Sequence, residues 1–285
     1  MSLTELLVLR TASPKTNKLI KRALCPFFIK DMKYKEFLEE ILFLVSVPTC
    51  VGCGERLDYK EKVYCNRCKP IYNEQKARTC SRCKNSLDSC SCATFYLEKH
   101  NVKSLTKLFR YFKEEDNLVA NNLIYSLKHD YRADVIDYTA CEIIGCLDRC
   151  GFLKNTSNTV ITNVPRRKSS IRKYGYDHTR LLAKRIAKQL EIEFVCPIVS
   201  LAKKEQKRAK SREERLKNVR FDYKKNVADL SGKTVILVDD VVTTGASMGS
   251  VAMLLRGLGA KKIVGASLSI AYKDSYIPFE ESKNK

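Results

Sequence analysis

The sequence predicts an α/β fold, a parallel β-sheet flanked by helices, with a small cysteine-rich module before it. Short apolar, β-branched runs alternate with segments whose apolar residues recur at helical spacing. This alternation is typical of parallel strands joined by right-handed crossovers. Ahead of it, eight of the thirteen cysteines are crowded into residues 50–92. We therefore expect three parts: an N-terminal extension at 1–35, the cysteine-rich module at 36–98 and the α/β domain at 99–285.

The elements of the α/β part are placed from their periodicity. Apolar residues at helical spacing predict helices around 118–127, 135–147, 181–190 and 247–258, with Asp177 or Thr179 placed to cap the third. Strand-like runs lie at 160–164, 235–238 and 263–270. A further apolar stretch at 194–199 precedes a charged insertion at 203–220.

The cysteines of the module occur in close pairs, a spacing that lets two thiolates bind one metal ion. Three pairs have two residues between their cysteines, and the fourth has one. Two pairs together complete a tetrahedral set of four sulfur ligands, which suits a structural zinc site. The first set is Cys50, Cys53, Cys65 and Cys68, and the second is Cys80, Cys83, Cys90 and Cys92. We predict two zinc ribbons; a disulfide framework, which needs an oxidising compartment, and iron–sulfur ligation are the alternatives.

The run at 235–238 ends in two carboxylates and is followed by a turn of small residues that opens onto a helix. Ligands of open α/β sheets bind outside the carboxyl ends of the strands. Adjacent carboxylates suit ribose hydroxyls or a hydrated Mg²⁺, and a helix N-terminus offers unpaired N–H groups to an anion. We predict a pocket for a ribose with a 5′-phosphate, formed by Asp239, Asp240, Thr243, Thr244, Gly245, Ala246 and Ser247. The alternatives are a plain buried strand and, for the second acid, a cap or turn residue.

A basic loop follows the run at 160–164 and so belongs to the same edge of the predicted sheet. Its cations are Arg166, Arg167, Lys168, Arg172 and Lys173. Such a group neutralises a pyrophosphate, and arginine adds forked contacts that lysine cannot make. Contact with nucleic-acid phosphates and simple exposure to water are equally compatible with the pattern. His178, beside a helix start, is interpreted as a capping or packing residue in preference to a catalytic base.

The charge of the chain points to a phosphorylated partner. The formal net charge is +21, and residues 166–225 hold 20 Lys and Arg against 7 Asp and Glu. Phe221 and Tyr223 interleave with these cations as candidate platforms for stacked bases. A solvated basic surface and ordinary aromatic packing are the alternatives.

No apolar run reaches the roughly 18–20 residues that a membrane span requires. The start of the chain also lacks the basic stretch, apolar core and cleavage site of a secretory signal. We expect a cytoplasmic protein without membrane insertion.

The acidic strand and its turn carry a resemblance to a known family. The segment Val-Asp-Asp-Val-Val-Thr-Thr-Gly-Ala-Ser at 238–247 resembles the phosphoribosyl pyrophosphate (PRPP) motif of type I phosphoribosyltransferases. The cysteine pairs, a Tyr-Ser-Leu-Lys segment at 125–128, the Pro-Arg-Arg loop at 165–167 and an aromatic segment at 173–178 precede it. In this order the parts resemble the ComF family over roughly 36–272.

The resemblance implies a type I phosphoribosyltransferase fold behind a zinc module, binding PRPP with Mg²⁺. It also implies a role in DNA uptake during natural transformation, with a DNA-uptake helicase or channel protein as a candidate partner. Two hypotheses remain: a handler of single-stranded DNA that keeps a nucleotide-type pocket, and an enzyme that transfers phosphoribosyl to an unidentified acceptor. The long cationic run favours the first.

Overall fold

The computed structural model describes residues 48–111, 118–201, 221–225, 227 and 229–271. Contacts divide the chain into Met1–Pro48 and Thr49–Lys285, and the second unit is described below. The predicted extension at 1–35 and the charged insertion at 203–220 lie outside the described residues.

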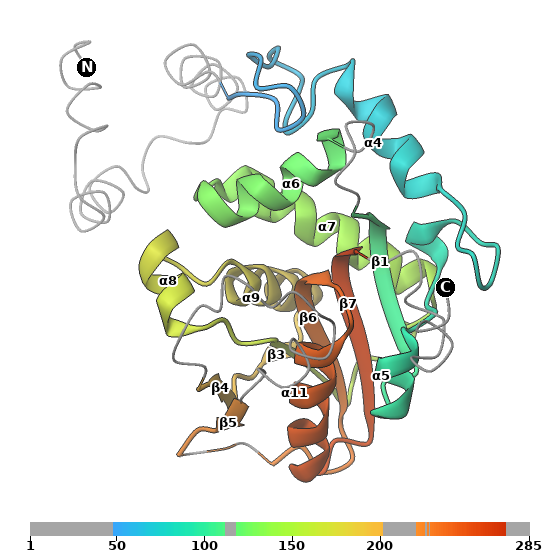
Figure 1. Cartoon of the computed structure of the whole chain (residues 1–285), viewed down its shortest axis with the longest axis vertical. Helices are drawn as coiled ribbons and strands as arrows, with labels where there is room; N and C mark the ends of the chain where they lie inside the picture. Colours follow the sequence, from blue (N-terminus) through green and yellow to red (C-terminus); the bar gives the residue numbers. More distant parts are fainter. Residues whose placement is uncertain (1–47, 112–117, 202–220, 226, 228, 272–285) are drawn as a thin grey trace, which may run out of the picture. The chain divides into compact units, whose positions relative to one another are not determined.

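The centre of this unit is a five-stranded, fully parallel sheet in the order β1-β7-β6-β2-β3 (Figure 1). Its strands are β1 Ser104–Arg110, β2 Thr159–Asn163, β3 Glu193–Phe194, β6 Thr234–Val242 and β7 Lys262–Ile270. The neighbouring strands β4 Ile198–Ser200 and β5 Phe221–Tyr223 form a separate antiparallel pair. The predicted fold class, a parallel sheet flanked by helices, is confirmed.

Two of the apolar runs noted in the sequence have different bounds as strands. The apolar stretch at 194–199 is divided between β3 and β4, because Pro197 lacks the N–H that a continuous ladder requires. The run at 235–238 continues to Val242, since Val241 and Val242 remain paired with Ser269 and Ile270 of β7. The two carboxylates therefore lie inside the last half of β6 and do not follow it.

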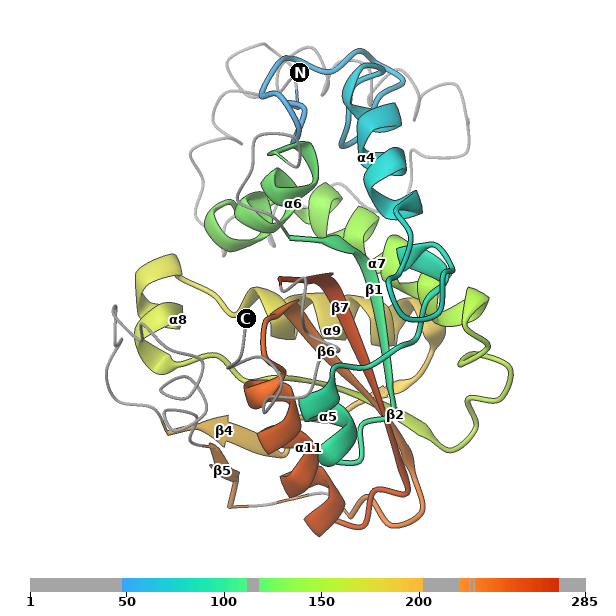
Figure 2. The same ribbon diagram turned by 45° about the vertical axis from the view of Figure 1, so that its right-hand side comes forward.

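Helices cover both faces of the sheet. The described helical segments are α4 Cys68–Ala77, η1 Leu87–Ser89, α5 Phe95–Lys99, α6 Leu118–His129, α7 Ala133–Arg149, α8 Lys168–Tyr174, α9 His178–Leu190 and α11 Ala246–Gly257. One core cluster joins α6, α7 and α9 to one face, where Ile236 and Val238 point. The other cluster joins α5 and α11 to the opposite face, where Val235 and Leu237 point. Figure 2 shows α5 and α11 side by side against the sheet.

The first part of the cysteine-rich segment packs directly on the α/β core. Tyr72 of α4 is fully buried, stacks on Tyr64 with centroids 4.7 Å apart and meets Phe109 of β1 edge-on at 6.2 Å. Lys76 of α4 forms an ion pair with Glu142 of α7. The apolar core of this unit is therefore continuous from the segment around Tyr72 to the sheet.

None of the helices in the described ranges is long and apolar enough to cross a membrane.

Phe109 joins the cysteine-rich segment around Tyr72 to the sheet. Truncation of its side chain therefore tests whether both regions depend on one core. We expect Phe109→Ala to lower the free energy of unfolding by about 3–5 kcal/mol, because a fully buried ring is replaced by a cavity. Urea unfolding measures the change. Met253→Ala is the control: its side chain is 57% exposed, so the change should stay within about 0.5 kcal/mol. Equal effects of the two substitutions would contradict the shared core.

Candidate functional site

Asp239 and Asp240 point to opposite faces of the sheet, because successive side chains of a strand alternate. Asp240 continues the series of Ile236 and Val238 toward the face covered by α6 and α9. Asp239 continues the series of Val235 and Leu237 toward the face covered by α11. The adjacent carboxylates therefore have different surroundings.

Asp240 is held by three basic side chains. Lys128 at the end of α6 lies 3.0 Å from its Oδ2, Arg166 of the basic loop lies 3.5 Å away, and His178 at the start of α9 lies 2.8 Å away. The carboxylate is 15% exposed. Side chains of α6, the basic loop and α9 thus converge on one oxygen atom at the carboxyl edge of the sheet.

His178 is fixed as the link between Asp240 and the basic loop. Its Nε2 lies 2.8 Å from Asp240, and Arg166 Nη1 lies 2.7 Å from its Nδ1 and 2.6 Å from its Nε2. A neutral ring with the proton on Nε2 donates to the carboxylate, and the guanidinium lies against both ring nitrogens. Burial lowers the pKa of His178 and outweighs the opposing effect of Asp240. Asp177 caps α9 by accepting from the Arg180 N–H, as one of the two capping alternatives predicts.

The two carboxylates differ in acidity for physical reasons. Burial, with the charge of Asp240 beside it, raises the pKa of Asp239 well above its usual range. Burial alone would also raise the pKa of Asp240, but Lys128, His178 and Arg166 together hold it well below its usual range. Asp240 is accordingly the fixed anion of the pair, and Asp239 is the carboxyl group that a cation or hydroxyl donors would stabilise as an anion.

The turn after β6 leads straight into α11. Gly245 has a φ of +87°, a left-handed conformation that favours glycine, and is the N-cap of α11 without a side-chain cap. Thr244 is buried and its Oγ1 accepts from the Ala246 N–H at 3.2 Å, whereas Thr243 and Ser247 are half-buried. The turn and the first N–H groups of α11 provide donors that suit an anion.

A short helix that follows the cysteine-rich segment supports this turn. Thr94 caps α5 and its hydroxyl donates to the Thr244 carbonyl at 3.4 Å. A Cβ added at Gly245 would lie 2.8 Å from Leu97 and 2.9 Å from the Thr94 hydroxyl. Any larger residue at position 245 would therefore have to displace α5 as well as adopt an unfavourable φ.

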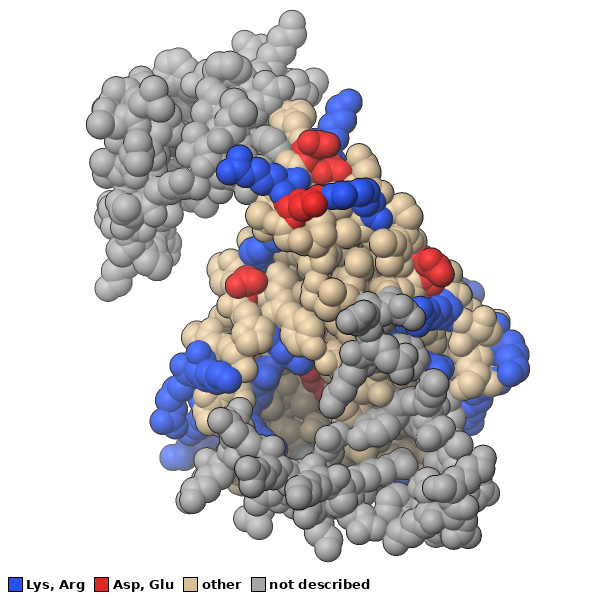
Figure 3. All heavy atoms as spheres, turned by 45° about the horizontal axis from the view of Figure 1, so that its top comes forward, with Lys and Arg blue, Asp and Glu red and all other residues tan. Residues whose placement is uncertain are grey.

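The predicted basic loop is divided by the structure. Arg166 faces Asp240 and His178, Arg167 is the N-cap of α8, and Lys168 begins that helix. Arg172 and Lys173 are exposed in its last turn. In Figure 3, Lys and Arg side chains gather beside a hollow in which an acidic side chain is visible. The loop thus supplies one cation to the carboxylates and several to the surface around them.

Two residues of this cluster were not predicted from the sequence. Lys128 stood out only as part of a family-like segment, and His178 was interpreted as a cap or packing residue. His178 is indeed buried, yet it also bonds the carboxylate. The sequence carries no local pattern that links these residues, because Asp240 is 112 residues from Lys128 and 62 residues from His178 along the chain.

Both predicted cysteine sets are assembled. In each set the four sulfur atoms lie within 4.8 Å of one another, so each set could hold one metal ion. The described cysteines, all but Cys25, are free thiols, which argues against the disulfide alternative. At the first set burial would raise the pKa of the Cys50 thiol, but N–H groups of Cys65, Cys53 and Gly52 lower it to about 7, whereas burial and the neighbouring thiols raise the pKa of Cys53 and Cys68. A Cβ at Gly52 would meet the Cys68 sulfur at 2.7 Å, so this turn requires glycine.

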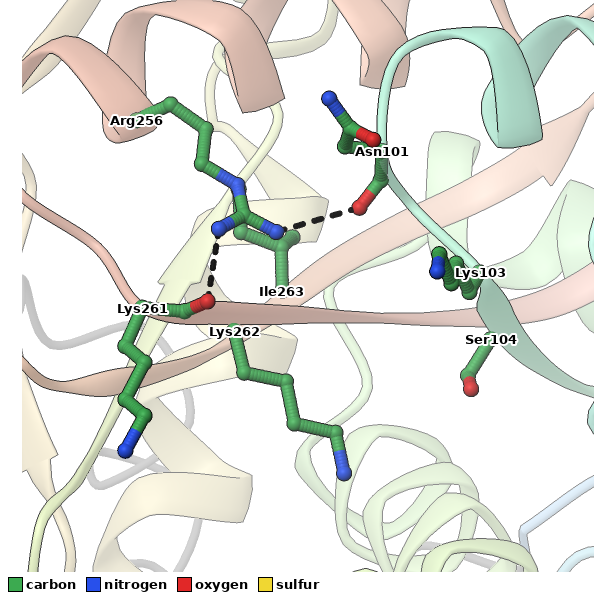
Figure 4. Close-up of a pocket in the computed structure, with 7 residues that line it drawn as sticks. All are labelled: Asn101, Lys103, Ser104, Arg256, Lys261, Lys262 and Ile263. Carbon is green, nitrogen blue, oxygen red and sulfur yellow. Dashed lines mark hydrogen bonds between the residues drawn. The ribbon is translucent and has the colours of Figure 1, made fainter.

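A separate cavity of about 690 Å³ lies at the opposite edge of the sheet, where β1 and β7 begin. Figure 4 shows the Arg256 guanidinium bonded to the backbone carbonyl groups of Asn101 and Lys261. Lys103, Lys261 and Lys262 at its rim are exposed. This cavity holds none of the predicted ligand residues.

Comparison with known proteins gives matches in sequence and in structure. Residues 179–281 match the family model described as "Phosphoribosyl transferase domain". Competence protein F of Haemophilus influenzae is 33% identical over 93 residues, which cover 31% of this chain and 40% of that protein. A ribose-phosphate pyrophosphokinase of Thermococcus kodakarensis is 57% identical over 35 residues, 12% of each chain.

Among solved structures, a purine phosphoribosyltransferase from Pyrococcus horikoshii aligns at a TM-score of 0.32 and 20% identity, covering 47% of this chain and 72% of that one. Adenine phosphoribosyltransferase from Saccharomyces cerevisiae aligns at 0.33 and 16%, covering 50% and 70%.

The acidic strand β6, its turn and α11 lie within residues 179–281, the part of the chain that is similar to the phosphoribosyl transferase domain family. Over 93 residues the chain is also similar to Competence protein F, which agrees with the ComF-like order of its motifs. The chain spans less than half the length of each curated relative that it matches here.

The buried His178 makes stability depend on pH. Its pKa lies below the ordinary value, so on acidification the unfolded chain takes up this proton first and unfolding is favoured. We expect the free energy of unfolding to fall less between pH 7.5 and pH 5.5 in His178→Gln than in the wild type, measured by urea unfolding at both values.

The exposed His129 provides the matched control, since His129→Gln also removes one histidine. This control should keep the wild-type pH dependence. An unchanged pH dependence in His178→Gln would contradict the neutral, buried state of His178.

Proposed function

We propose that this ComF-like protein binds PRPP with Mg²⁺ at the carboxyl edge of β6 and handles single-stranded DNA during DNA uptake. The observation that carries the proposal is the acidic strand β6, which runs directly into the glycine turn of α11, with Asp240 held by three basic side chains. This arrangement offers carboxylates for a diol and N–H groups for a phosphate within one continuous segment.

The proposed roles follow from the surroundings of each group. Asp239 takes the ribose hydroxyls or Mg²⁺, because Arg166 alone of the three basic groups at Asp240 also favours the charged form of Asp239. Asp240 completes the pair and holds Lys128, Arg166 and His178 in place. The turn from Thr243 to Ser247, including Thr244, Gly245 and Ala246, takes the 5′-phosphate at the start of α11. When bound, Mg²⁺ neutralises the pyrophosphate oxygens.

The pyrophosphate is assigned to the cations nearest the carboxylates. Arg166 already lies at the edge of the pair, 3.5 Å from Asp240. Arg167 and Lys168 follow it at the start of α8. Arginine in this position is suited to forked contacts with phosphate oxygens.

Single-stranded DNA is assigned to the surface around α8. Arg172 and Lys173 are exposed there, and Tyr131, 67% exposed, packs edge-on against Tyr176 at 5.7 Å. Exposed aromatic rings beside cations suit stacked bases and a phosphate backbone. Tyr223 is 38% exposed, though its hydroxyl donates to the Leu254 carbonyl. Phe221, the other predicted platform, packs against the core, as the alternative interpretation predicts.

Two zinc ions are proposed as the metals of the cysteine sets. Four thiolates at mutual distances within 4.8 Å fit a tetrahedral zinc ion. Zinc there supplies folding free energy and does no chemistry on a ligand. We place the action of the protein in the cytoplasm, where it meets incoming DNA from an uptake helicase or channel protein.

The second candidate is an active phosphoribosyltransferase. The match of residues 179–281 to the phosphoribosyl transferase domain favours it. Titration with Mg²⁺-PRPP across a panel of bases and amines, followed by pyrophosphate detection, separates the candidates. Pyrophosphate released only with a particular acceptor supports the enzyme, whereas tight binding without turnover supports the DNA handler.

Removal of the carboxylate pair tests the pocket. We expect Asp239→Asn with Asp240→Asn to weaken Mg²⁺-PRPP binding roughly 10-fold to 100-fold, because charged contacts to the diol and metal are lost. Isothermal calorimetry gives the affinity, and circular dichroism verifies folding. Asp222→Asn, at an exposed position of β5, controls for the loss of a carboxylate. Wild-type affinity in the double variant would show that the pocket lies elsewhere.

Salt dependence tests the DNA surface. Phosphate contacts release counterions, so the logarithm of single-stranded DNA affinity should fall linearly with the logarithm of salt concentration, by about 0.7 per contacted phosphate. Arg172→Ala and Lys173→Ala together should make this slope shallower in fluorescence anisotropy titrations. The control replaces Lys261 and Lys262, two exposed cations of the opposite edge, and should keep the slope. Equal slopes in the two double variants would overturn the assignment of this surface.

A further inference from the structure

Lys107 is a fully buried lysine in the middle of β1. Its side chain reaches the second cysteine set: Nζ lies 3.1 Å from the Cys90 sulfur and 2.8 Å from the Cys92 carbonyl oxygen. The carbonyl oxygens of Cys90 and Leu105 lie 3.5 Å and 3.2 Å away. A strand of the α/β sheet thus places a cationic side chain directly against two predicted metal ligands.

The contacts suit a charged ammonium group. All four of these partners are hydrogen-bond acceptors, and an ammonium group offers three N–H donors and no acceptor. Burial of such a charge is costly unless hydrogen bonds and an opposite charge compensate it. Four thiolates around one divalent metal ion carry a net charge of −2, which provides that opposite charge.

The two cysteine sets differ in this respect. At the first set, the Cys50 sulfur accepts the Cys65 backbone N–H at 3.3 Å, and Cys53 is exposed. At the second set, Cys90 accepts from the Cys92 N–H at 3.4 Å and also contacts the Lys107 ammonium. Only the second set therefore has a cationic side chain of the sheet among the sulfur contacts described here.

Backbone pairing fixes the second set to the same strand. Cys92 forms a bridge with Ser104, and the Leu105 N–H donates to the Ser91 carbonyl at 2.9 Å. Arg149 of α7 adds an ion pair to Asp88 of η1 at 3.1 Å. The loop that carries Cys90 and Cys92 is consequently docked on β1, so that Lys107 keeps its position relative to the sulfur atoms.

We propose that Lys107 is a positioning residue of the second metal site: its buried ammonium offsets the thiolate charge, orients Cys90 and Cys92, and makes this site bind its metal more tightly. The inference rests on the proposed zinc sites, and it adds that their affinities are set separately. Partners of this kind, one step removed from the metal, typically change metal affinity by roughly 10-fold to 100-fold.

The test is zinc retention by the full-length, zinc-loaded protein. The first site is removed by Cys53→Ser, which leaves one zinc ion per chain, and retention is followed with increasing concentrations of a chromogenic chelator. In this background Lys107→Met should release zinc at roughly 10-fold to 100-fold lower chelator concentration. Lys103→Met, at an exposed position near the start of β1, is the control and should retain zinc as the background does.

A reciprocal background separates a local effect from general destabilisation. With the second site removed by Cys83→Ser, Lys107→Met should leave zinc retention at the first site unchanged. Equal weakening of both sites, or no weakening of the second, would overturn the role of Lys107. If the Cys53→Ser background itself holds no zinc, the proposal that the second cysteine set binds zinc is contradicted, and the role of Lys107 with it.

Cobalt substitution provides a readout that folding alone does not move. Loss of an N–H donor to sulfur raises the energy of the thiolate electrons, so the thiolate-to-Co²⁺ absorption should shift to longer wavelength in Lys107→Met. Lys107→Gln keeps N–H donors without the charge, and it replaces the Met variant in these measurements if that variant does not fold. Its zinc retention and its cobalt absorption should lie between those of the unsubstituted background and those expected for Lys107→Met. Wild-type spectra and zinc retention in a folded variant would contradict the proposal.

Discussion

Strand β6 is the constraint on which the rest of the site depends. Because side chains alternate along a strand, its two adjacent carboxylates must face different layers of the protein. On one face Lys128 and His178 contact Asp240, and the face toward which Asp239 points is covered by α11. A pair that looks symmetrical in the sequence therefore becomes one fixed anion and one carboxyl group open to further compensation.

Compensation of buried charge recurs at two places in this unit. Asp240 is an anion kept at the sheet edge by three basic side chains, and Lys107 is a cation kept beside the thiols of the second cysteine set. In both places the contacting groups come largely from other segments of the chain, so each charge is stabilised only when the tertiary structure is complete. Charge pairing thus ties folding of the domain to formation of its candidate sites.

The cysteine-rich segment is integrated with the α/β domain and supports the turn after β6. Tyr72 lies in the same core as Phe109, and the Cys92 loop is paired with β1. The segment then leads to α5, where Thr94 and Leu97 fit against the turn at Gly245. The cysteine-rich segment therefore leads directly into the helix that packs against the turn after β6.

The sequence by itself determined the features that depend on neighbouring residues. Strand and helix periodicity predicted the parallel sheet, and the cysteine pairs predicted both sulfur clusters. The acidic strand with its glycine turn predicted that the candidate site lies at the carboxyl edge of the sheet. The tertiary structure alone decided which distant side chains meet there: Lys128 and His178 on Asp240, Lys107 on Cys90, and α5 on Gly245. The physical reason is that periodicity, caps and ligand spacing act within a few residues, whereas packing of the layers selects partners far apart in the chain and sets the protonation of what they bury.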